Sequence, residues 1–228
     1  MASPKRNGIS LASPWPRRSA FALAACVRQA DPSHPRSRVG AMSIPFDVAV
    51  VDLETTGLRP ADSILQVAVV NCPAQGSSFD QWCTYVRPPR VLTANLGPTH
   101  IHGIKRRNVL FAPNLESTMR RLVDLTRDRV VVAHNAPFDV GFIRAAAERV
   151  RVSLAWAGVL CTLDLSRRLD PQRRKNHKLS SLCRDYGITL DHAHDALHDA
   201  RATAELLGHL LAPNGIDSLD AARAYFLP

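Results

Sequence analysis

The sequence predicts a single α/β domain, and three observations support this prediction. The chain has 228 residues, 46% of them hydrophobic, which suffices for one domain with a substantial core and leaves little room for a second. Short apolar runs rich in β-branched residues alternate with longer segments of helical periodicity. The first of these runs leads directly into two carboxylates, Asp52 and Glu54.

The first strand is expected where five of the six positions from Phe46 to Val51 are apolar, because this run is too short for a helix. Side chains two apart on a strand point to the same face, so Asp52 and Glu54 would lie side by side. Two like charges leaving a core are unfavourable unless a cation lies between them, and oxygen ligands suit a divalent ion. An ordinary surface strand is the simpler alternative for this pair taken alone.

Turn residues from Thr55 to Asp62 separate this strand from a second apolar run at residues 64–70. We expect these two strands to pair as an antiparallel hairpin. A third strand at residues 79–86 alternates less well and is stopped by two prolines, which favours the edge of the sheet. Residues 92–113 show no sustained period and are expected to be irregular surface.

Helices and short strands alternate in the second half of the chain. An apolar stripe predicts an amphipathic helix over Asn114–Thr126, and a valine run predicts a fourth strand at residues 129–133. Asn and Pro then signal a helix start whose first turn contains Asp139, although an acid there often only complements the helix dipole. A short fifth strand at residues 160–163, a short helix and a glycine-capped helix over Lys178–Tyr186 are expected next.

The last informative stretch precedes a long helix. Apolar residues recur at intervals of three and four from residue 197 to residue 211, which predicts a helix that begins near Ala196 and is capped by Asp195. His194 would then lie in the preceding loop, from which it can fold back beside Asp199. An ordinary surface histidine is the alternative interpretation.

The formal net charge of +9 is unevenly distributed, because residues 1–41 contribute +6 and the rest of the chain +3. A mildly basic body with a cluster of acids fits a nucleic-acid enzyme that binds metal ions better than a pure phosphate-binding module. A solvated basic surface is the simpler alternative. The basic segment at residues 173–178 is expected to be an exposed loop that adjoins the substrate side.

Cysteine usage indicates a reducing, cytoplasmic compartment. The number of cysteines is odd and no Cys-x-x-Cys pair occurs, so neither a disulfide framework nor a zinc site is expected. The five are Cys26, Cys72, Cys83, Cys161 and Cys183. No apolar run approaches the roughly 18 residues that a membrane helix needs, so no membrane association is expected.

The first 41 residues form a separate segment in this interpretation. They are rich in Ser, Pro, Arg and Ala without periodicity, so we expect a disordered or leader segment over residues 1–41 and the folded domain over residues 42–228. A short lipoprotein signal that ends at Cys26 is one alternative. A misassigned start, with Met42 opening the protein, is another.

Taken together, these motifs resemble the DEDDh family of 3′-to-5′ exonucleases, which includes the proofreading epsilon subunit of bacterial DNA polymerase III. The resemblance runs from about residue 46 to residue 211 and rests on six blocks in the family's order. These blocks are Val51–Gly57, His102–Ile104, Ala133–Asp139, Thr162–Ser166, Lys178–Leu182 and His194–Thr203.

The resemblance implies a ribonuclease H-like fold with a mixed five-stranded sheet flanked by helices. It implies that two divalent cations, Mg²⁺ or Mn²⁺, orient the attacking water and stabilise the attacking and leaving oxygens. Their ligands would be Asp52, Glu54, Asp139 and Asp199, with Asp52 bridging the two ions. His194 would act as the general base. The terminal nucleotide would be held by Thr55, Thr56, Leu58 and His102.

Departures from the family pattern bear on the substrate. Epsilon-like members often carry an acidic residue shortly before His-Gly-Ile, and Leu96–Thr99 has none, which leaves the contact with the terminal sugar open. Oligoribonucleases of the family carry Met where Thr55 stands, which favours DNA 3′ ends, single-stranded or mismatched, over RNA.

The C-terminal residues and the set of chemical positions bear on the partners and on the class of function. About 17 residues follow Leu211 and no sliding-clamp motif is apparent, so a DNA polymerase subunit is only a possible partner. A catalytically idle nucleic-acid-binding subunit is the alternative to an enzyme. The presence of all five chemical positions favours the enzyme.

Overall fold

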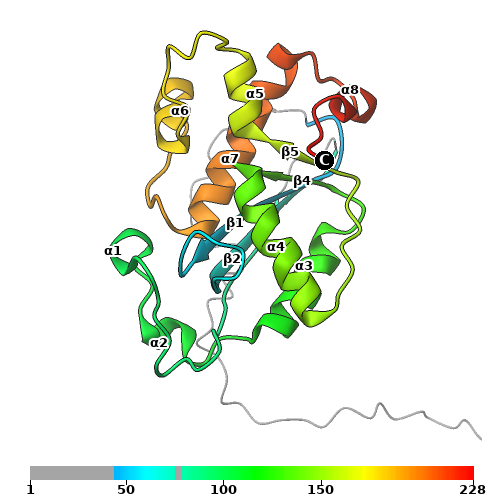
Figure 1. The fold of residues 1–228 in the computed structure, drawn as a ribbon. Helices are drawn as coiled ribbons and strands as arrows, with labels where there is room; N and C mark the ends of the chain where they lie inside the picture. The colour runs from blue at the N-terminus through cyan, green and yellow to red at the C-terminus, as the bar shows by residue number, and fades with distance from the viewer. Residues whose placement is uncertain (1–43, 75–78) are drawn as a thin grey trace, which may run out of the picture.

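The structure is a computed structural model that describes residues 44–74 and 79–228 (Figure 1). Its strands are β1 (Val48–Thr55), β2 (Ile64–Cys72), β3 (Asp80–Tyr85), β4 (Val130–Ala133) and β5 (Gly158–Cys161). They form one five-stranded sheet in the order β3-β2-β1-β4-β5. The pairs β1–β2 and β2–β3 are antiparallel, whereas β1–β4 and β4–β5 are parallel. The predicted mixed sheet, its first hairpin and the edge position of β3 are confirmed.

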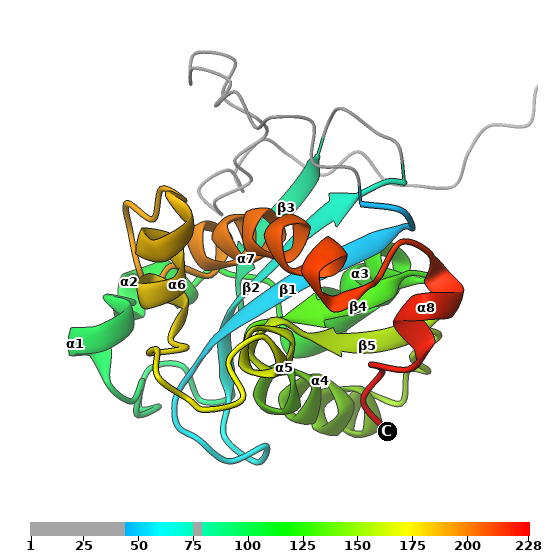
Figure 2. The same cartoon turned by 90° about the horizontal axis from the view of Figure 1, so that it is seen from above.

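Helices cover both faces of this sheet (Figure 2). They are α1 (Thr99–His102), α2 (Arg106–Val109), α3 (Leu115–Thr126), α4 (Ala136–Val150), α5 (Thr162–Arg168), α6 (Leu179–Tyr186), α7 (Ala196–Leu211) and α8 (Leu219–Arg223), with a 3₁₀ turn at Ala212–Asn214. One face packs against α3 and α4 and the other against α5, α6, α7 and α8. The two faces hold the two main hydrophobic cores.

The alternation of β1 decides which face receives the carboxylates. Ala49 and Val51 belong to the core under α3 and α4, whereas Val48 and Val50 belong to the core under α7. Because successive strand side chains alternate, Asp52 and Glu54 continue the row that faces α7. The apolar first half of β1 therefore packs in the two hydrophobic cores, and its polar end places Asp52 and Glu54 on the face that α7 covers.

Two expectations about local structure were wrong. The fifth strand ends at Cys161 rather than residue 163, because its partner β4 ends at Ala133, which pairs with Cys161. The segment 92–113, expected to be irregular, contains α1 and α2. These helices are too short to show a period, and they are held by a small core of Leu65, Leu96, Ile104 and Val109.

The leader prediction for residues 1–41, and with it Cys26, lies outside the described residues. The other four cysteines are buried and form no disulfide. Over the described ranges 44–74 and 79–228, no helix combines the length and the apolar character needed to cross a membrane.

Candidate active site

Asp52 and Glu54 are partly buried near the end of β1. The neighbouring strand places Ala68 opposite Asp52 and Gln66 opposite Glu54. The register of this pairing shifts between Glu54 and Thr55, so the regular strand gives way to a turn directly after the second carboxylate. Both carboxylates therefore project from the last regularly paired residues of β1, a rigid strand inside the sheet.

Asp139 reaches the same place from α4. The helix begins after Asn135, which has the left-handed φ of 66°, and it carries a proline in its first turn. Asp139 is only 4% exposed, and its Oδ1 accepts a hydrogen bond of 3.1 Å from the backbone N–H of Leu53. This hydrogen bond therefore fixes the carboxylate of Asp139 against β1. Its position in the first turn of α4 does more than complement the helix dipole, because it brings the carboxylate to the strand that carries Asp52 and Glu54.

Asp199 lies in the first turns of α7, which begins at Ala196 as expected. The side chain of Asp195 caps the helix by accepting from the N–H of Leu197 at 3.1 Å. Asp199 is 9% exposed, and its Oδ1 has no hydrogen-bond partner among the described residues. A buried carboxylate oxygen without a donor is costly, so this atom needs a cation or another ligand.

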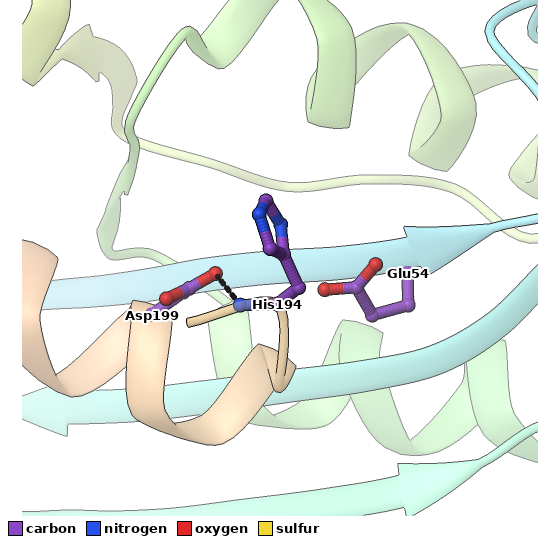
Figure 3. Close-up of side chains that lie close together, drawn as sticks. All are labelled: Glu54, His194 and Asp199. Carbon is purple, nitrogen blue, oxygen red and sulfur yellow. Dashed lines mark hydrogen bonds between the residues drawn. The ribbon is translucent and has the colours of Figure 1, made fainter. Parts of the chain in front are cut away.

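His194 stands in the loop before α7, as the helix boundary predicts. Its backbone has a φ of 67°, and its N–H donates to Asp199 Oδ2 at 3.0 Å. Its exposed ring extends from the loop beside Glu54 and Asp199 (Figure 3). One possible ligand atom from each of these three residues lies within 4.8 Å of the others.

The electrostatics of the four carboxylates favour a cation. Desolvation is the main cause that raises the pKa of Asp52 well above its ordinary value, and the charges of Asp139 and Asp199 raise it further. Burial and the charge of Asp199 raise the pKa of Glu54 to about 8. Burial also raises the pKa values of Asp139 and Asp199. Without a cation the cluster retains protons at neutral pH, and hard oxygen ligands of this kind suit Mg²⁺ or Mn²⁺.

Three of the residues predicted to hold the terminal nucleotide lie at the last position of β1 and in the turn that follows it: Thr55, Thr56 and Leu58. The hydroxyl of Thr55 donates to the carbonyl of Gly57 at 2.6 Å, and the hydroxyl of Thr56 accepts from the N–H of Ser63 at 2.9 Å. These two bonds stiffen the turn. The side chain of Leu58, in contrast, is 83% exposed and open to a ligand.

His102 is differently placed, because its ring braces the backbone around it. Its Nδ1 accepts from the N–H of Ile104 at 3.0 Å, so its Nε2 carries the proton and donates to the carbonyl of Leu96 at 3.1 Å. Burial lowers the pKa of this histidine, which keeps it neutral. Any contact with substrate would therefore use the edge or face of the ring rather than a free nitrogen.

Gln66 is a site residue that sequence reasoning missed. From β2, its Oε1 accepts from the N–H of Ala196 at 3.3 Å and its Nε2 donates to Asp195 Oδ2 at 3.4 Å. It therefore fastens the start of α7 to the strand next to Glu54. No local pattern indicates this, because the partners are 129 and 130 residues away.

His134 was also missed, although it lies in one of the blocks that carry the family resemblance. Its Nδ1 is 3.0 Å from Thr162 Oγ1, and its Nε2 is 3.0 Å from the carbonyl oxygen of His177. Burial lowers its pKa to about 4, so it stays neutral. This ring ties the junction between β4 and α4 to the chain that follows α5.

Comparison with known proteins identifies the class. Residues 49–207 match the family model described as Exonuclease, and this span contains all five chemical positions. The chain therefore belongs to the exonuclease family.

Particular relatives are larger proteins. The chain is 33% identical over 187 residues to a Mycobacterium tuberculosis protein provisionally named a bifunctional exonuclease/endonuclease. This match covers 77% of this chain and 28% of that protein. It is 36% identical over 164 residues to the PolC-type DNA polymerase III of Bacillus subtilis, which covers 71% of this chain and 11% of the polymerase. The chain thus spans less than a third of either relative.

A solved structure shows the same fold. The nuclease domain of 3′hExo, described as a DEDDh family member bound to rAMP, superposes with a TM-score of 0.64 at 17% identity. The match covers 77% of this chain and 96% of that domain. The ribonuclease H-like architecture expected from the sequence is confirmed.

Proposed function

We propose that this protein removes nucleotides from the 3′ ends of DNA, single-stranded or mismatched, with two divalent cations, Mg²⁺ or Mn²⁺, in the carboxylate cluster. The observation that carries the proposal is the convergence of four carboxylates with raised pKa values, one of which has an oxygen without a donor, beside the exposed ring of His194. Similarity to a PolC-type DNA polymerase favours DNA as the substrate and a DNA polymerase as the partner. The odd number of cysteines without a Cys-x-x-Cys pair favours a reducing, cytoplasmic location.

Each carboxylate has a distinct place in this proposal. Glu54 and Asp199 offer ligand atoms within 4.8 Å of one another, and the charges of Asp139 and Asp199 act on Asp52. These four carboxylates would therefore hold the cations together, with Asp52 shared as in the family that the sequence resembles. When bound, the cations would stabilise the charge that develops on the attacking and leaving oxygens of the phosphodiester.

His194 would accept the proton of the attacking water. Its backbone is fixed by the hydrogen bond to Asp199, whereas its ring is exposed and, among residues 44–74 and 79–228, has no side-chain hydrogen bond that would hold it away from a substrate. A histidine at the mouth of an acidic cluster is a suitable general base near neutral pH. The stiffened turn at Thr55–Leu58 would then present its backbone and the exposed Leu58 to the terminal nucleotide.

The test is digestion of 5′-labelled DNA and RNA oligomers of one sequence, single-stranded and with a 3′ mismatch, in Mg²⁺, Mn²⁺ or EDTA. We expect labelled products that shorten from the 3′ end, faster for DNA, and no reaction in EDTA or with Asp52→Asn. Faster loss of RNA would reassign the substrate. Binding without cleavage would identify an idle subunit, and cleavage that persists in EDTA would contradict the proposed mechanism.

A further inference from the structure

Residues 170–178, which lie in the connection from α5 to α6 and are here named the basic loop, carry a net positive charge. Its exposed cationic side chains are Arg173, Arg174, Lys175 and Lys178. Within the described parts of the chain none of the four forms an ion pair, whereas Arg120 on α3 pairs with Glu116 at 2.9 Å. The loop therefore presents free cations to a ligand.

The loop has a defined shape without a ligand. Asp170 Oδ2 accepts from the backbone N–H of Lys175 at 2.8 Å and lies 3.2 Å from His177 Nε2. The other ring nitrogen of His177 is 2.9 Å from Ser166 Oγ on α5. This internal acid turns the backbone so that the cationic side chains point outward. A pre-formed surface loses less conformational entropy on binding than a flexible one.

The loop is also attached to the active site. The carbonyl of His177 contacts the ring of His134 at 3.0 Å, and His134 directly precedes Asn135, the N-cap of the helix that carries Asp139. Beyond the loop, α6 lies alongside α7, which carries Asp199 (Figures 1 and 2). The basic loop thus contacts the residue that precedes the N-cap of α4 and leads into a helix that packs on α7, and α4 and α7 each supply a carboxylate to the cluster.

We propose that the basic loop binds the phosphates of the substrate strand upstream of its 3′-terminal nucleotide. This inference rests on the proposed function, because it assigns a second contact to the same nucleic-acid substrate. Exposed Arg and Lys side chains on a fixed backbone bind phosphates without reading sequence, and each phosphate neutralised releases counterions. The contribution of the loop is therefore salt-dependent and needs a strand long enough to reach it.

The experiment compares three full-length proteins: wild type, the loop variant Arg173→Gln/Arg174→Gln/Lys175→Gln, and the control variant Arg120→Gln/Arg121→Gln/Arg127→Gln. The control removes the same charge from exposed positions in and after α3, on the opposite face of the sheet. The probe is fluorescein-labelled oligothymidylate of 20 or 3 nucleotides, and its anisotropy is measured in EDTA over a range of salt concentrations.

For the 20-nucleotide strand, we expect the loop variant to lose roughly tenfold or more in affinity at low salt and its log–log salt slope to fall by about 2, since each single-strand phosphate contact contributes about 0.7. The control variant should bind as wild type, and the trinucleotide should not distinguish the proteins. Equal losses in both variants, or an equal loss on the trinucleotide, would overturn the assignment of the loop.

A separate measurement distinguishes failure of the proposed nuclease function from failure of the proposed role of the basic loop. The p-nitrophenyl ester of thymidine 5′-monophosphate has no upstream strand, so its hydrolysis in Mn²⁺ reports on the carboxylate cluster alone. A wild-type protein that fails to hydrolyse it would overturn the nuclease proposal, whereas the binding comparison would still decide the role of the loop.

Discussion

Asp52 has opposite effects on activity and on the stability of the cation-free protein. Its carboxylate is desolvated beside Asp139 and Asp199, which raises its pKa, so its charged form is unfavourable without a cation. We expect Asp52→Asn to lower turnover by roughly 10³ or more, as the loss of a metal ligand would, and to raise the melting temperature in EDTA at pH 8 by several degrees. Calorimetry and oligomer digestion measure the two effects.

The control for this prediction is Asp185→Asn, which removes an exposed carboxylate of α6 outside the cluster. It should change neither the melting temperature nor turnover appreciably. If Asp52→Asn instead lowers the melting temperature in EDTA, the carboxylate forms favourable contacts in the cation-free protein and the account of the cluster is incorrect.

The histidines near α7 allow a matched test of the general base. His194→Ala should lower turnover by roughly 10² or more, the range for the loss of a general base, while Mn²⁺ affinity by titration calorimetry stays near normal. His198→Ala is the control, because its ring packs against His192 at a centroid distance of 4.9 Å and is not part of the cluster. A parallel loss of Mn²⁺ affinity in His194→Ala would identify His194 as a metal ligand. A loss of turnover only in His198→Ala would identify His198 as the general base instead.

Between elements, the contact of β2 with α7 determines where the loop of His194 lies. Gln66→Met keeps the length of the buried side chain but leaves the N–H of Ala196 without its acceptor, so we expect destabilisation by about 1–3 kcal/mol. The start of α7 positions both Asp199, in its first turns, and the preceding loop that carries His194. We therefore expect kcat to fall more than KM rises. Urea unfolding and steady-state kinetics provide the measurements.

Gln81→Met is the matched control on the neighbouring strand β3. Gln81 Oε1 accepts from Arg201 Nε at 2.5 Å, so the substitution also removes a contact between the sheet and α7, but not one at the helix start. It should destabilise the protein without the selective fall in kcat. Equal kinetic effects of the two variants would show that Gln66 acts only through stability.

Local signals explain why most elements could be predicted. Asn114 caps α3 by accepting from the N–H of Ser117 at 2.9 Å, and Gly187 ends α6 with a left-handed φ of 70°. The start of α7 followed from Asp195 in the same way. The helices α1 and α2 could not be found, because contacts with Leu65 hold them rather than any pattern of their own.

In the site too, local sequence patterns predicted some residues, whereas contacts between elements far apart in the chain position the others. Strand alternation predicted that Asp52 and Glu54 share a face, and the helix boundary predicted that His194 precedes α7. The bond from the N–H of Leu53 to Asp139 spans 86 residues, so only the family resemblance joined Asp139 to the cluster. Gln66 and His134 remained hidden because their partners lie in other elements.

For the molecule as a whole, the raised pKa values predict a stability that depends on pH and cations. The pKa of Glu54 rises from 4.5 to about 8 on folding, so the folded state binds more protons than the unfolded state between these values. This contribution is fully present below pH 4.5 and is lost as the pH rises through about 8. The melting temperature in EDTA should therefore fall from pH 5 to pH 9 more steeply than that of Asp52→Asn.

Mn²⁺ replaces the protons of the cluster, so the stabilisation that it gives should be small at pH 5 and larger at pH 8. Scanning calorimetry with EDTA and with Mn²⁺ at each pH measures the difference. A gain that does not depend on pH would place the bound cation away from these carboxylates.

The boundary of the domain gives a further prediction. Ile44 and Phe46 are 3% and 5% exposed within the core under α7, so packing is already established at the start of the described chain. A shortened protein that begins at Met42 should match the full chain in melting temperature and in oligomer digestion. Aggregation of the shortened protein, or loss of most activity, would assign a structural role to residues 1–41.

The distribution of the four carboxylates along the chain has a consequence for the timing of activity in the cell. The first two residues of the cluster leave the ribosome early, but Asp199 and His194 arrive only with α7, the last long helix. A nascent chain that has completed the sheet would still lack one proposed metal ligand and the proposed base. On the proposed function, the protein would therefore stay inactive until α7 packs against the sheet.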